Sequence, residues 1–309
     1  MVLESDLPLP ELAPAGEAEP ESRFRILPVL EAAPAPCPFF HRWLLPDGRL
    51  WLGFARQRSG YLLRFPDLAD FLLSPGGDEI RCHPASGAAP DTIRHLLLDQ
   101  VIPLVLSQRD RLVLHASGVL VSGRGIAFLG VTGQGKSTLA ASFSQQGFPL
   151  LTDDCLSVED AGEGLFLVPS YPGLRLWPKV IAELFGAEPV LGPVAHYSGK
   201  KRLGFESGSV RFCSAPVPLR RLYLLAPPSG TGRTGTASLT PLSPRDTFIE
   251  LVKYAYCLDV RDGERLQSRF RLFARVAEAG PVLRLSYPRD LSLLPAVREA
   301  ILADLESGP

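Results

Sequence analysis

One octapeptide constrains this chain more than any other feature. Residues 130–137 are GVTGQGKS, which satisfies G-x-x-x-x-G-K-[ST], and they follow an apolar run at 126–129 and precede a helical pattern at 137–146. In a strand–loop–helix unit this spacing builds a phosphate-binding loop, because its glycines let backbone N–H groups converge on phosphate oxygens at a helix start. The sequence therefore predicts an α/β fold with a nucleotide site. The alternative is a glycine-rich turn that carries an incidental lysine.

The residue types of this P-loop, or Walker A motif, predict a role for each position. We expect Lys136 to reach the β and γ phosphates and Ser137 to offer its hydroxyl to Mg²⁺, with Thr138 as a less favourable substitute one residue later. No Asn-Lys-x-Asp guanine signature occurs, so ATP with Mg²⁺ is the expected cofactor pair. The predicted nucleotide-binding set is Gly130, Thr132, Gly133, Gln134, Gly135, Lys136, Ser137 and Thr138.

Two adjacent carboxylates follow the next predicted strand. The apolar run 148–152 ends in Asp153 and Asp154, at the strand end where ligands bind in α/β sheets. One aspartate can hold Mg²⁺ while the other accepts a proton from an attacking hydroxyl. Neighbouring strand residues point to opposite faces, which leaves open that one of them faces away or that both form a solvated turn. His115 ends the apolar strand 112–114, where a lone histidine is usually structural.

Composition excludes several classes of protein. The chain has 309 residues with 32 Lys+Arg, 33 Asp+Glu and a net charge of −1, which supplies no overall basic field for nucleic acid or membranes. Its five cysteines form no C-x-x-C pair, so neither a zinc site nor a disulfide framework is indicated. Without a secretory signal or about 18 consecutive apolar residues, we expect a cytoplasmic protein.

Patterning along the chain predicts three parts. Residues 1–22, rich in Pro, Ala and Glu, indicate a flexible tail. Residues 23–107 alternate short apolar runs with turn signals and predict a smaller β-rich N-terminal domain, with helical spacing at 67–73 and a linking helix at 91–107. Asp91 would cap that helix and Pro103 would divide it. Residues 108–309 form the predicted catalytic domain, with strands at 216–227 and 281–285 and helices at 261–278 and 292–305. A further helix is predicted to start at Ser243, and one face of it is lined by Phe248, Leu251, Val252 and Ala255.

Further cations could contact phosphates or the acceptor. Arg175 follows a Pro-Gly turn, and Lys200, Lys201 and Arg202 follow Ser198-Gly199. The ordinary alternatives are a surface salt bridge for Arg175 and a solvated face for the cluster. The surrounding stretch 192–204 combines turn residues with cations, so we hypothesise that it acts as a lid.

Three blocks, 114–121, 125–137 and 147–154, together resemble the catalytic domain of HPr kinase/phosphorylase. The resemblance implies a P-loop catalytic domain with Asp153 or Asp154 as catalytic base and Mg²⁺ partner, and with His115 near the transferring phosphate. The chain lacks the family's Glu-x-Arg-Gly-Leu-Gly segment. Residues 170–178 stand there without an acid, which argues against the reverse phosphorylase reaction.

The whole chain is more similar to the HPr-kinase-related proteins encoded with peptide-tailoring genes, including lasso-peptide precursor kinases. The shared features are Pro-x-x-Arg-Leu-Trp at 172–177, His-Ala-Ser at 115–117 and the β-rich amino-terminal part. This resemblance implies an ATP- and Mg²⁺-dependent kinase acting on serine in a ribosomal peptide or small protein. Because related kinases form oligomers, it also implies that this chain could form a homo-oligomer. The alternatives are an HPr-type regulatory kinase, a small-metabolite kinase, or a non-catalytic nucleotide-gated binding protein.

Overall fold

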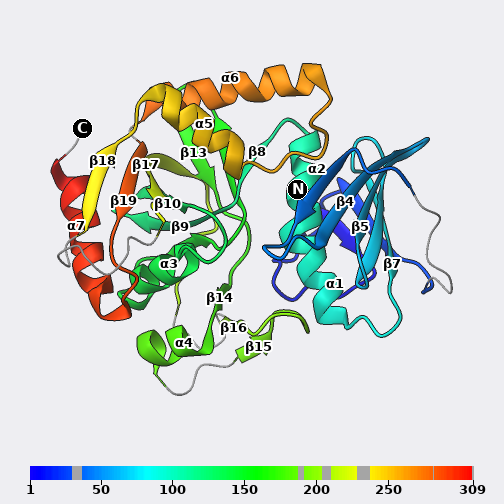
Figure 1. Ribbon diagram of the computed structural model, residues 1–309, viewed down its shortest axis with the longest axis horizontal. Helices are drawn as coiled ribbons and strands as arrows, with labels where there is room; N and C mark the ends of the chain where they lie inside the picture. Colours follow the sequence, from blue (N-terminus) through cyan, green and yellow to red (C-terminus); the bar gives the residue numbers. More distant parts are fainter. Residues whose placement is uncertain (30–36, 187–190, 204–209, 228–236, 281, 308–309) are drawn as a thin grey trace. The chain divides into compact units, whose positions relative to one another are not determined.

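The computed structural model describes residues 1–29, 37–186, 191–203, 210–227, 237–280 and 282–307 (Figure 1). The chain forms two compact units. The first comprises Met1–Asp110 with the later segments Val194–Ser198 and Cys257–Leu266, and the second comprises Arg111–Pro193, Gly199–Tyr256 and Gln267–Pro309. The chain therefore leaves the second unit twice and returns each time, which has no counterpart in the sequence-based division at residue 107.

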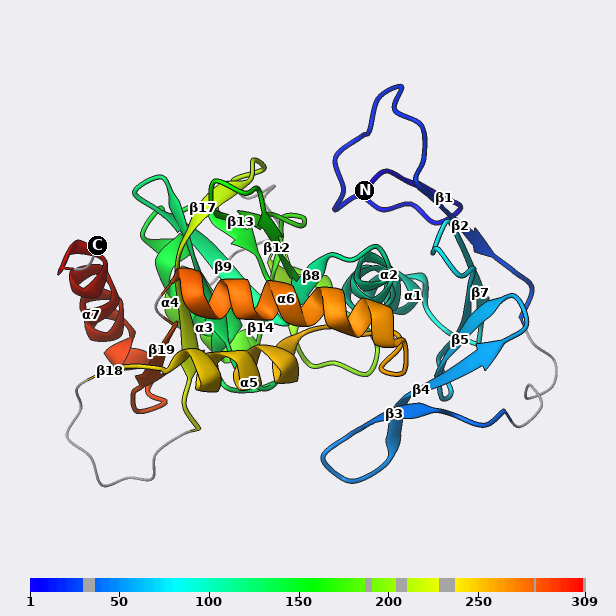
Figure 2. The same cartoon turned by 90° about the horizontal axis from the view of Figure 1, so that it is seen from above.

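The first unit is built on a sheet of seven described strands in the order β1-β2-β7-β6-β5-β4-β3. Strands β3 to β7 pair antiparallel along β3-β4-β5-β6-β7, whereas β1 with β2 and β2 with β7 are parallel. Figure 2 shows the β4–β5 hairpin in blue. The bounds are β1 Leu3–Ser5, β2 Ser22–Ile26, β3 His41–Leu44, β4 Leu50–Gln57, β5 Gly60–Phe65, β6 Ala69–Leu73 and β7 Glu79–Pro84.

The expectations for residues 67–73 and 1–22 of this unit are wrong. The helical spacing at 67–73 belongs to strand β6, which pairs with β5 and β7 and is buried along nearly its whole length, so its sequence lacks the alternation of a half-exposed strand. The segment 1–22 is not without structure, because β1 pairs with β2 and Leu7 is buried. Several of the acids that suggested a solvated tail instead form ion pairs, Glu4 with Arg23 and Arg25 of β2 and Glu11 with Arg94 of α1.

The predicted linking helix exists and is divided before Pro103. It consists of α1 Pro90–Leu96, a π-helical turn at Leu97–Val101 and α2 Ile102–Gln108. Proline lacks an N–H donor and its ring clashes with the carbonyl four residues earlier, which disfavours continuous α-helical bonding. The N-cap is Ala89 rather than Asp91, because Pro90 occupies the first helical turn. The predicted buried face is confirmed at Ile93, Leu96, Leu97 and Val101.

The second unit is a mixed α/β structure around a larger sheet. The strand order is β11-β9-β10-β17-β13-β12-β8, with β19 on β17 and β18 on β19. Strands β10, β17 and β19 are parallel, and β11 shares their direction because it and β10 are both antiparallel to β9. The bounds are β8 Leu112–Leu114, β9 Ala116–Val121, β10 Arg124–Leu129, β11 Leu150–Thr152, β12 Leu156–Asp160, β13 Leu165–Val168, β17 Val217–Leu225, β18 Ser238–Pro241 and β19 Val282–Ser286.

This direction of the strands places three sequence blocks at one edge of the sheet. The loop after β10 and the aspartates after β11 both follow carboxyl ends at that edge. Ala116, the first residue of β9, pairs with Leu129, the last of β10, so the preceding His115 also lies there. Because β8 and β9 are separated only by His115 yet lie at different positions in the strand order, the sheet curls back on itself.

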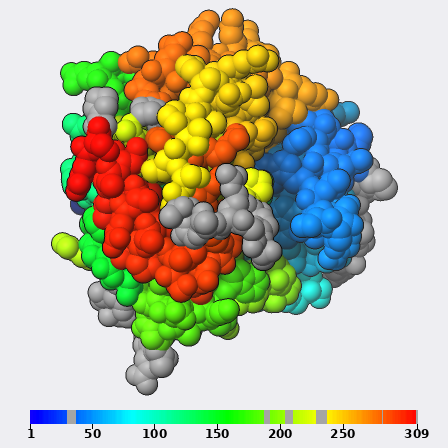
Figure 3. All heavy atoms as spheres, turned by 60° about the vertical axis from the view of Figure 1, so that its left-hand side comes forward, coloured from blue at the N-terminus to red at the C-terminus, as the bar shows by residue number. Residues whose placement is uncertain are grey.

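Helices cover both faces of this sheet. Helices α3 Lys136–Gln145 and α7 Leu294–Ser307 pack on one face, and α5 Pro244–Tyr254 and the later part of α6 Gly263–Ala279 pack on the other (Figure 1). Figure 3 shows α7, in red, on the surface. A 3₁₀ turn at Leu291–Leu293 precedes α7. A small sheet has the strand order β14-β16-β15, with β14 at Leu174–Leu176, β15 at Leu191–Pro193 and β16 at Lys201–Leu203. Helix α4 Pro178–Phe185 follows β14.

The capping prediction for α5 is confirmed. Ser243 Oγ accepts a hydrogen bond from the Asp246 backbone N–H at 3.1 Å, and Pro244 begins the helix. Val252, predicted on the buried face, is 43% exposed, whereas Leu251 is buried. Residues 228–232, which follow the predicted strand 216–227, lie outside the described residues, as do residue 204 of the hypothesised lid and residue 281 of the predicted strand 281–285. Within the part of the chain that the structure describes, no helix combines the length and apolar character needed to cross a membrane.

Candidate functional site

The glycine-rich loop connects β10 to α3 and depends on backbone conformations that favour glycine. Gly133 and Gly135 have φ of 85° and 94°, in the left-handed region. A Cβ on Gly130 would lie 2.4 Å from Gln134 Oε1. That same oxygen accepts a hydrogen bond from the Val131 N–H at 2.8 Å, so the buried Gln134 side chain braces the loop from within.

Lys136 is held inside this loop. It is 5% exposed, and its Nζ donates to the carbonyl oxygens of Gly130 at 2.8 Å and Val131 at 3.4 Å. Burial lowers the pKa of Lys136, and the nearby charges of Asp154 and Asp153 oppose that change. An incoming phosphate would therefore offer the ammonium group a full negative charge in place of carbonyl dipoles.

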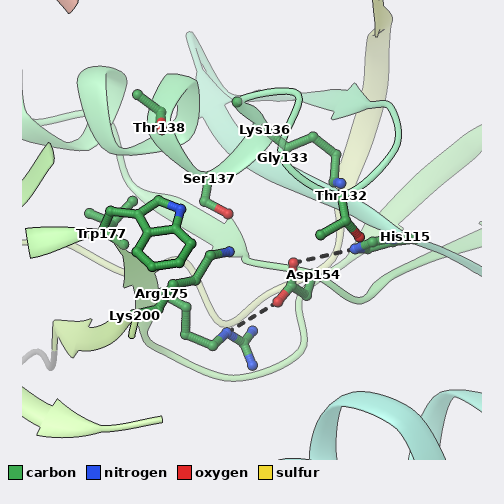
Figure 4. Close-up of a pocket in the computed structure, with 12 residues that line it drawn as sticks. His115, Thr132, Gly133, Lys136, Ser137, Thr138, Asp154, Arg175, Trp177 and Lys200 are labelled. Atoms are coloured by element: carbon green, nitrogen blue, oxygen red, sulfur yellow. Dashed lines mark ion pairs between the residues drawn. The ribbon is translucent and has the colours of Figure 1, made fainter. Parts of the chain in front are cut away.

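A pocket lies beside the loop (Figure 4). It joins the three sequence blocks, although Asp153, Gln134 and Gly130 are not among its lining residues. The pocket is lined by His115, Thr132, Gly133, Gly135, Lys136, Ser137, Thr138, Asp154, Arg175, Leu176, Trp177 and Lys200.

The two adjacent aspartates have different surroundings. The side chain of Asp153 has no exposed surface, and its Oδ1 accepts a 2.6 Å hydrogen bond from the Ser117 hydroxyl. Its Oδ2 accepts from the Arg175 backbone N–H at 2.9 Å. Burial, followed by the charge of Asp154, raises the pKa of Asp153. Asp153 therefore positions the chain beneath the pocket.

Asp154 turns toward the pocket instead. Its backbone has φ of 83°, a left-handed conformation that aspartate tolerates better than most residues. Its carboxylate lies 3.3 Å from Arg175 Nε and 3.5 Å from His115 Nε2, the two ion pairs drawn in Figure 4. Burial favours the neutral acid, but the Arg175 charge and then the His115 hydrogen bond outweigh it and hold the pKa of Asp154 well below its usual range. The pocket therefore contains an ionised carboxylate.

Arg175 is not a surface residue, so the surface salt bridge is wrong. It lies on β14, is 2% exposed, and donates to the Asp153 carbonyl and, at 2.9 Å, to the Tyr171 hydroxyl. With its ion pair to Asp154, Arg175 fixes the corner at which the chain turns after β11. Arg175, which contacts both aspartates, thus also lines the pocket.

His115 has both structural and pocket-facing contacts. Its backbone N–H donates to the Tyr254 carbonyl at 2.8 Å, and its ring centroid lies 6.3 Å from that of Tyr256. The ring nitrogen Nε2 faces Asp154. His115 therefore combines structural contacts with a position at the pocket.

The predicted cation cluster divides into three different environments. Lys200 lines the pocket, Lys201 is exposed on β16, and Arg202 is half-buried opposite Arg175 in the β14–β16 pairing. Burial lowers the pKa of Arg202. Within the stretch hypothesised as a lid, Val194–Ser198 belongs to the first unit and Gly199 onward to the second.

Sequence reasoning missed several residues of this site. The contact of Ser117 is not evident from the sequence, because its partner Asp153 is distant along the chain. Tyr171 is close in sequence to its partner Arg175, but a single tyrosine gives no sign of that hydrogen bond. Trp177 ends the quoted Pro-x-x-Arg-Leu-Trp segment, yet nothing in that pattern indicated that its indole lines the pocket.

The residues present fit a bound Mg²⁺. Magnesium is usually held by one or two carboxylates, waters and substrate phosphates rather than by a complete protein cage. Asp154 is ionised and Ser137 presents a hydroxyl to the same pocket. Elsewhere in the described ranges, too, no group of three or more His, Cys, Asp or Glu residues could hold a metal.

Comparisons with known proteins give one distant structural match to report. No family model and no curated protein matches the chain. The solved structure of the Hpr(Ser) kinase/phosphatase from Coxiella burnetii aligns with a TM-score of 0.32 and 12% sequence identity, covering 62% of this chain and 97% of that one. This likeness is too weak to assign the chain to a family.

Proposed function

We propose that this protein is a Mg²⁺-dependent kinase that transfers the γ-phosphoryl group of ATP to a serine hydroxyl on a peptide or small protein. The observation that carries the proposal is the convergence, in one pocket, of the glycine-rich loop, the buried Lys136 and the ionised Asp154. These groups match the needs of phosphoryl transfer, which are a cradle for phosphates, a cation for developing charge and an acceptor for the hydroxyl proton.

The groups that line the pocket share the tasks of this reaction. The backbone N–H groups of the loop bind the phosphates, and Lys136 neutralises charge on the β and γ groups. The serine oxygen forms a bond to the γ phosphorus as the bond to the β-phosphate oxygen breaks, and ADP leaves. The hydroxyl proton passes to a carboxylate oxygen of Asp154, which His115 and Arg175 keep oriented. Ser137 and Asp154 would hold Mg²⁺, which supplies further charge neutralisation to the phosphates.

The positions of the two aspartates refine the proposal. Asp153 is fully buried and hydrogen-bonded on both oxygens, so it has no free path to substrate. Proton acceptance and metal binding therefore both depend on Asp154 and its neighbours, with Asp153 as a positioning residue.

The test measures both nucleotide binding and transfer. The purified chain is incubated with Mg²⁺, γ-labelled ATP and an array of serine-containing peptides, each paired with its Ser→Ala counterpart. We expect label on a subset of serine peptides, none on their alanine counterparts, and a loss of about 100-fold or more in Lys136→Ala and Asp154→Asn. Glu163→Gln, an exposed acid of the same unit, is the matched control and should keep full activity.

The outcomes separate the candidate functions. Binding of ATP without transfer to any peptide would contradict the peptide kinase and favour a nucleotide-gated binding protein or a small-metabolite kinase. Failure to bind ATP at all would refute the nucleotide site itself.

A further inference from the structure

Trp177 is a large apolar side chain that neither the core nor the proposed mechanism uses. It directly follows β14 and is the N-cap residue of α4. The residue is 53% exposed although the preceding Leu176 is buried. An exposed tryptophan in a pocket wall gives a ligand an aromatic surface to cover, and burying an aromatic side chain contributes strongly to binding.

The indole rests against a glycine. A Cβ on Gly199 would lie 2.9 Å from Cζ3 of Trp177, closer than real Cβ contacts occur. The absence of a side chain at Gly199 thus lets the benzene half of the indole lie against the backbone. Because Gly199 supports the ring on one side and the ring is still half exposed, Trp177 presents an aromatic surface in a defined position.

The pocket has two chemically different ends. Figure 4 shows His115 and Asp154 on one side and Trp177 on the other, with Ser137 between them. In the proposed reaction the transferred γ-phosphate must lie at the His115–Asp154 end. The nucleoside of a bound triphosphate then extends away from that end, toward the side on which Trp177 lies.

We infer that Trp177 is the stacking residue for the purine base of the nucleotide, with Gly199 fixing the position of its ring. This inference rests on the proposed function, because the direction of the nucleotide follows from the position of the γ-phosphate. A planar purine matches an aromatic face, and such stacking is tolerant of base identity because every base presents a π-face. The residue therefore adds affinity for nucleotides over bare polyphosphate.

The experiment compares a ligand that has a base with one that lacks it. Dissociation constants for Mg²⁺·ATP and Mg²⁺·tripolyphosphate are measured by calorimetry on the full chain and on Trp177→Ala, Trp177→Phe and Gly199→Ala. We expect Trp177→Ala to weaken ATP binding about 10- to 100-fold and to change tripolyphosphate binding less than about 2-fold. Trp177→Phe should retain part of the preference for ATP, and Gly199→Ala should weaken ATP selectively.

Two controls make the result interpretable. Val252→Ala removes a comparably exposed apolar side chain from α5 and should leave both dissociation constants unchanged. Lys136→Ala should weaken both ligands, which reports on the phosphate site alone.

Several results would overturn the inference. Unchanged ATP binding in Trp177→Ala, as expected if the indole contacts the acceptor peptide instead, rejects base stacking. Equal weakening of ATP and tripolyphosphate rejects it as well, since the side chain would then support the phosphate site. If the wild-type chain binds neither ligand, the proposed function fails first and the inference falls with it.

Discussion

Replacing Arg175 with methionine should be among the most destabilising single changes in the second unit. Methionine has a similar length and no charge, so it preserves much of the packing while removing the guanidinium. In the wild type this group donates to the Tyr171 hydroxyl and the Asp153 carbonyl, and its Nε lies 3.3 Å from Asp154. The variant keeps two adjacent acids in a buried corner without their main counter-charge.

The magnitude follows from the burial of the group. Removing one partner of a buried, hydrogen-bonded ion pair typically costs about 3–5 kcal/mol, because the remaining charge stays desolvated. Arg175 is 2% exposed, so solvent screening does little to reduce this cost. We therefore expect Arg175→Met to lower the free energy of unfolding by about 4 kcal/mol at pH 7.5.

The loss should also depend on pH. Arg175 is the main reason that the pKa of Asp154 lies below its usual range despite burial. A depressed folded-state pKa stabilises the chain above the unfolded pKa of about 4, and that stabilisation disappears as the pH falls through the folded pKa. Without Arg175, burial raises the pKa of Asp154, so protonation at mildly acidic pH relieves the variant. The stability difference between wild type and variant should therefore shrink as the pH falls from 7.5 to 4.5.

Urea denaturation of the full chain, followed by circular dichroism at both pH values, measures this difference. Arg211→Met is the control, because Arg211 is an exposed arginine of the same unit and should change stability by less than about 0.5 kcal/mol. A loss below about 1 kcal/mol in Arg175→Met, or an equal loss at both pH values, would refute the argument that uncompensated buried charge dominates this corner.

Two further substitutions test local features of the fold by thermal denaturation. Gly60→Ala should destabilise the first unit by well over about 1 kcal/mol, because φ is 138° and the new Cβ would lie 1.9 Å from the Leu73 carbonyl oxygen. Gly48→Ala, with φ of 84° and open space, is its control, and an equal loss in both would show that the clash is irrelevant. Ser243→Ala should cost about 1 kcal/mol by removing the α5 cap, whereas Ser243→Asp should retain most of the stability; equal effects would contradict the capping argument.

The sequence predicted those parts of the site that are close together along the chain. The loop at 130–137 and the aspartates after β11 follow from strand–turn–helix patterns, whereas His115 was placed near them by the family resemblance; a pocket contains most of these residues. The different surroundings of Asp153 and Asp154 could not be predicted, since they depend on Ser117 and Arg175 reaching Asp153 from other strands.

The errors have a common physical origin. The segment 67–73 has helical spacing because β6 within it is buried on both faces, which removes the alternation on which a strand prediction depends. A surface salt bridge was a reasonable alternative for Arg175 because an arginine on its own carries no sign of burial. In both cases tertiary packing, rather than the local pattern, determines the outcome.

The two returning segments affect the order in which this protein can mature during translation. The first unit buries Val194, Ala195 and Leu258, and the Leu258 N–H donates to Ser107 at 3.1 Å within that unit. When residues 1–110 have emerged from the ribosome, all strands of the seven-stranded sheet are therefore present, but the two later segments of the first unit are not. Domains that are contiguous in sequence can fold as they emerge, amino-terminal part first. Here the packing of the first unit can be completed only after residue 266 has left the exit tunnel, when most of the chain has been synthesised.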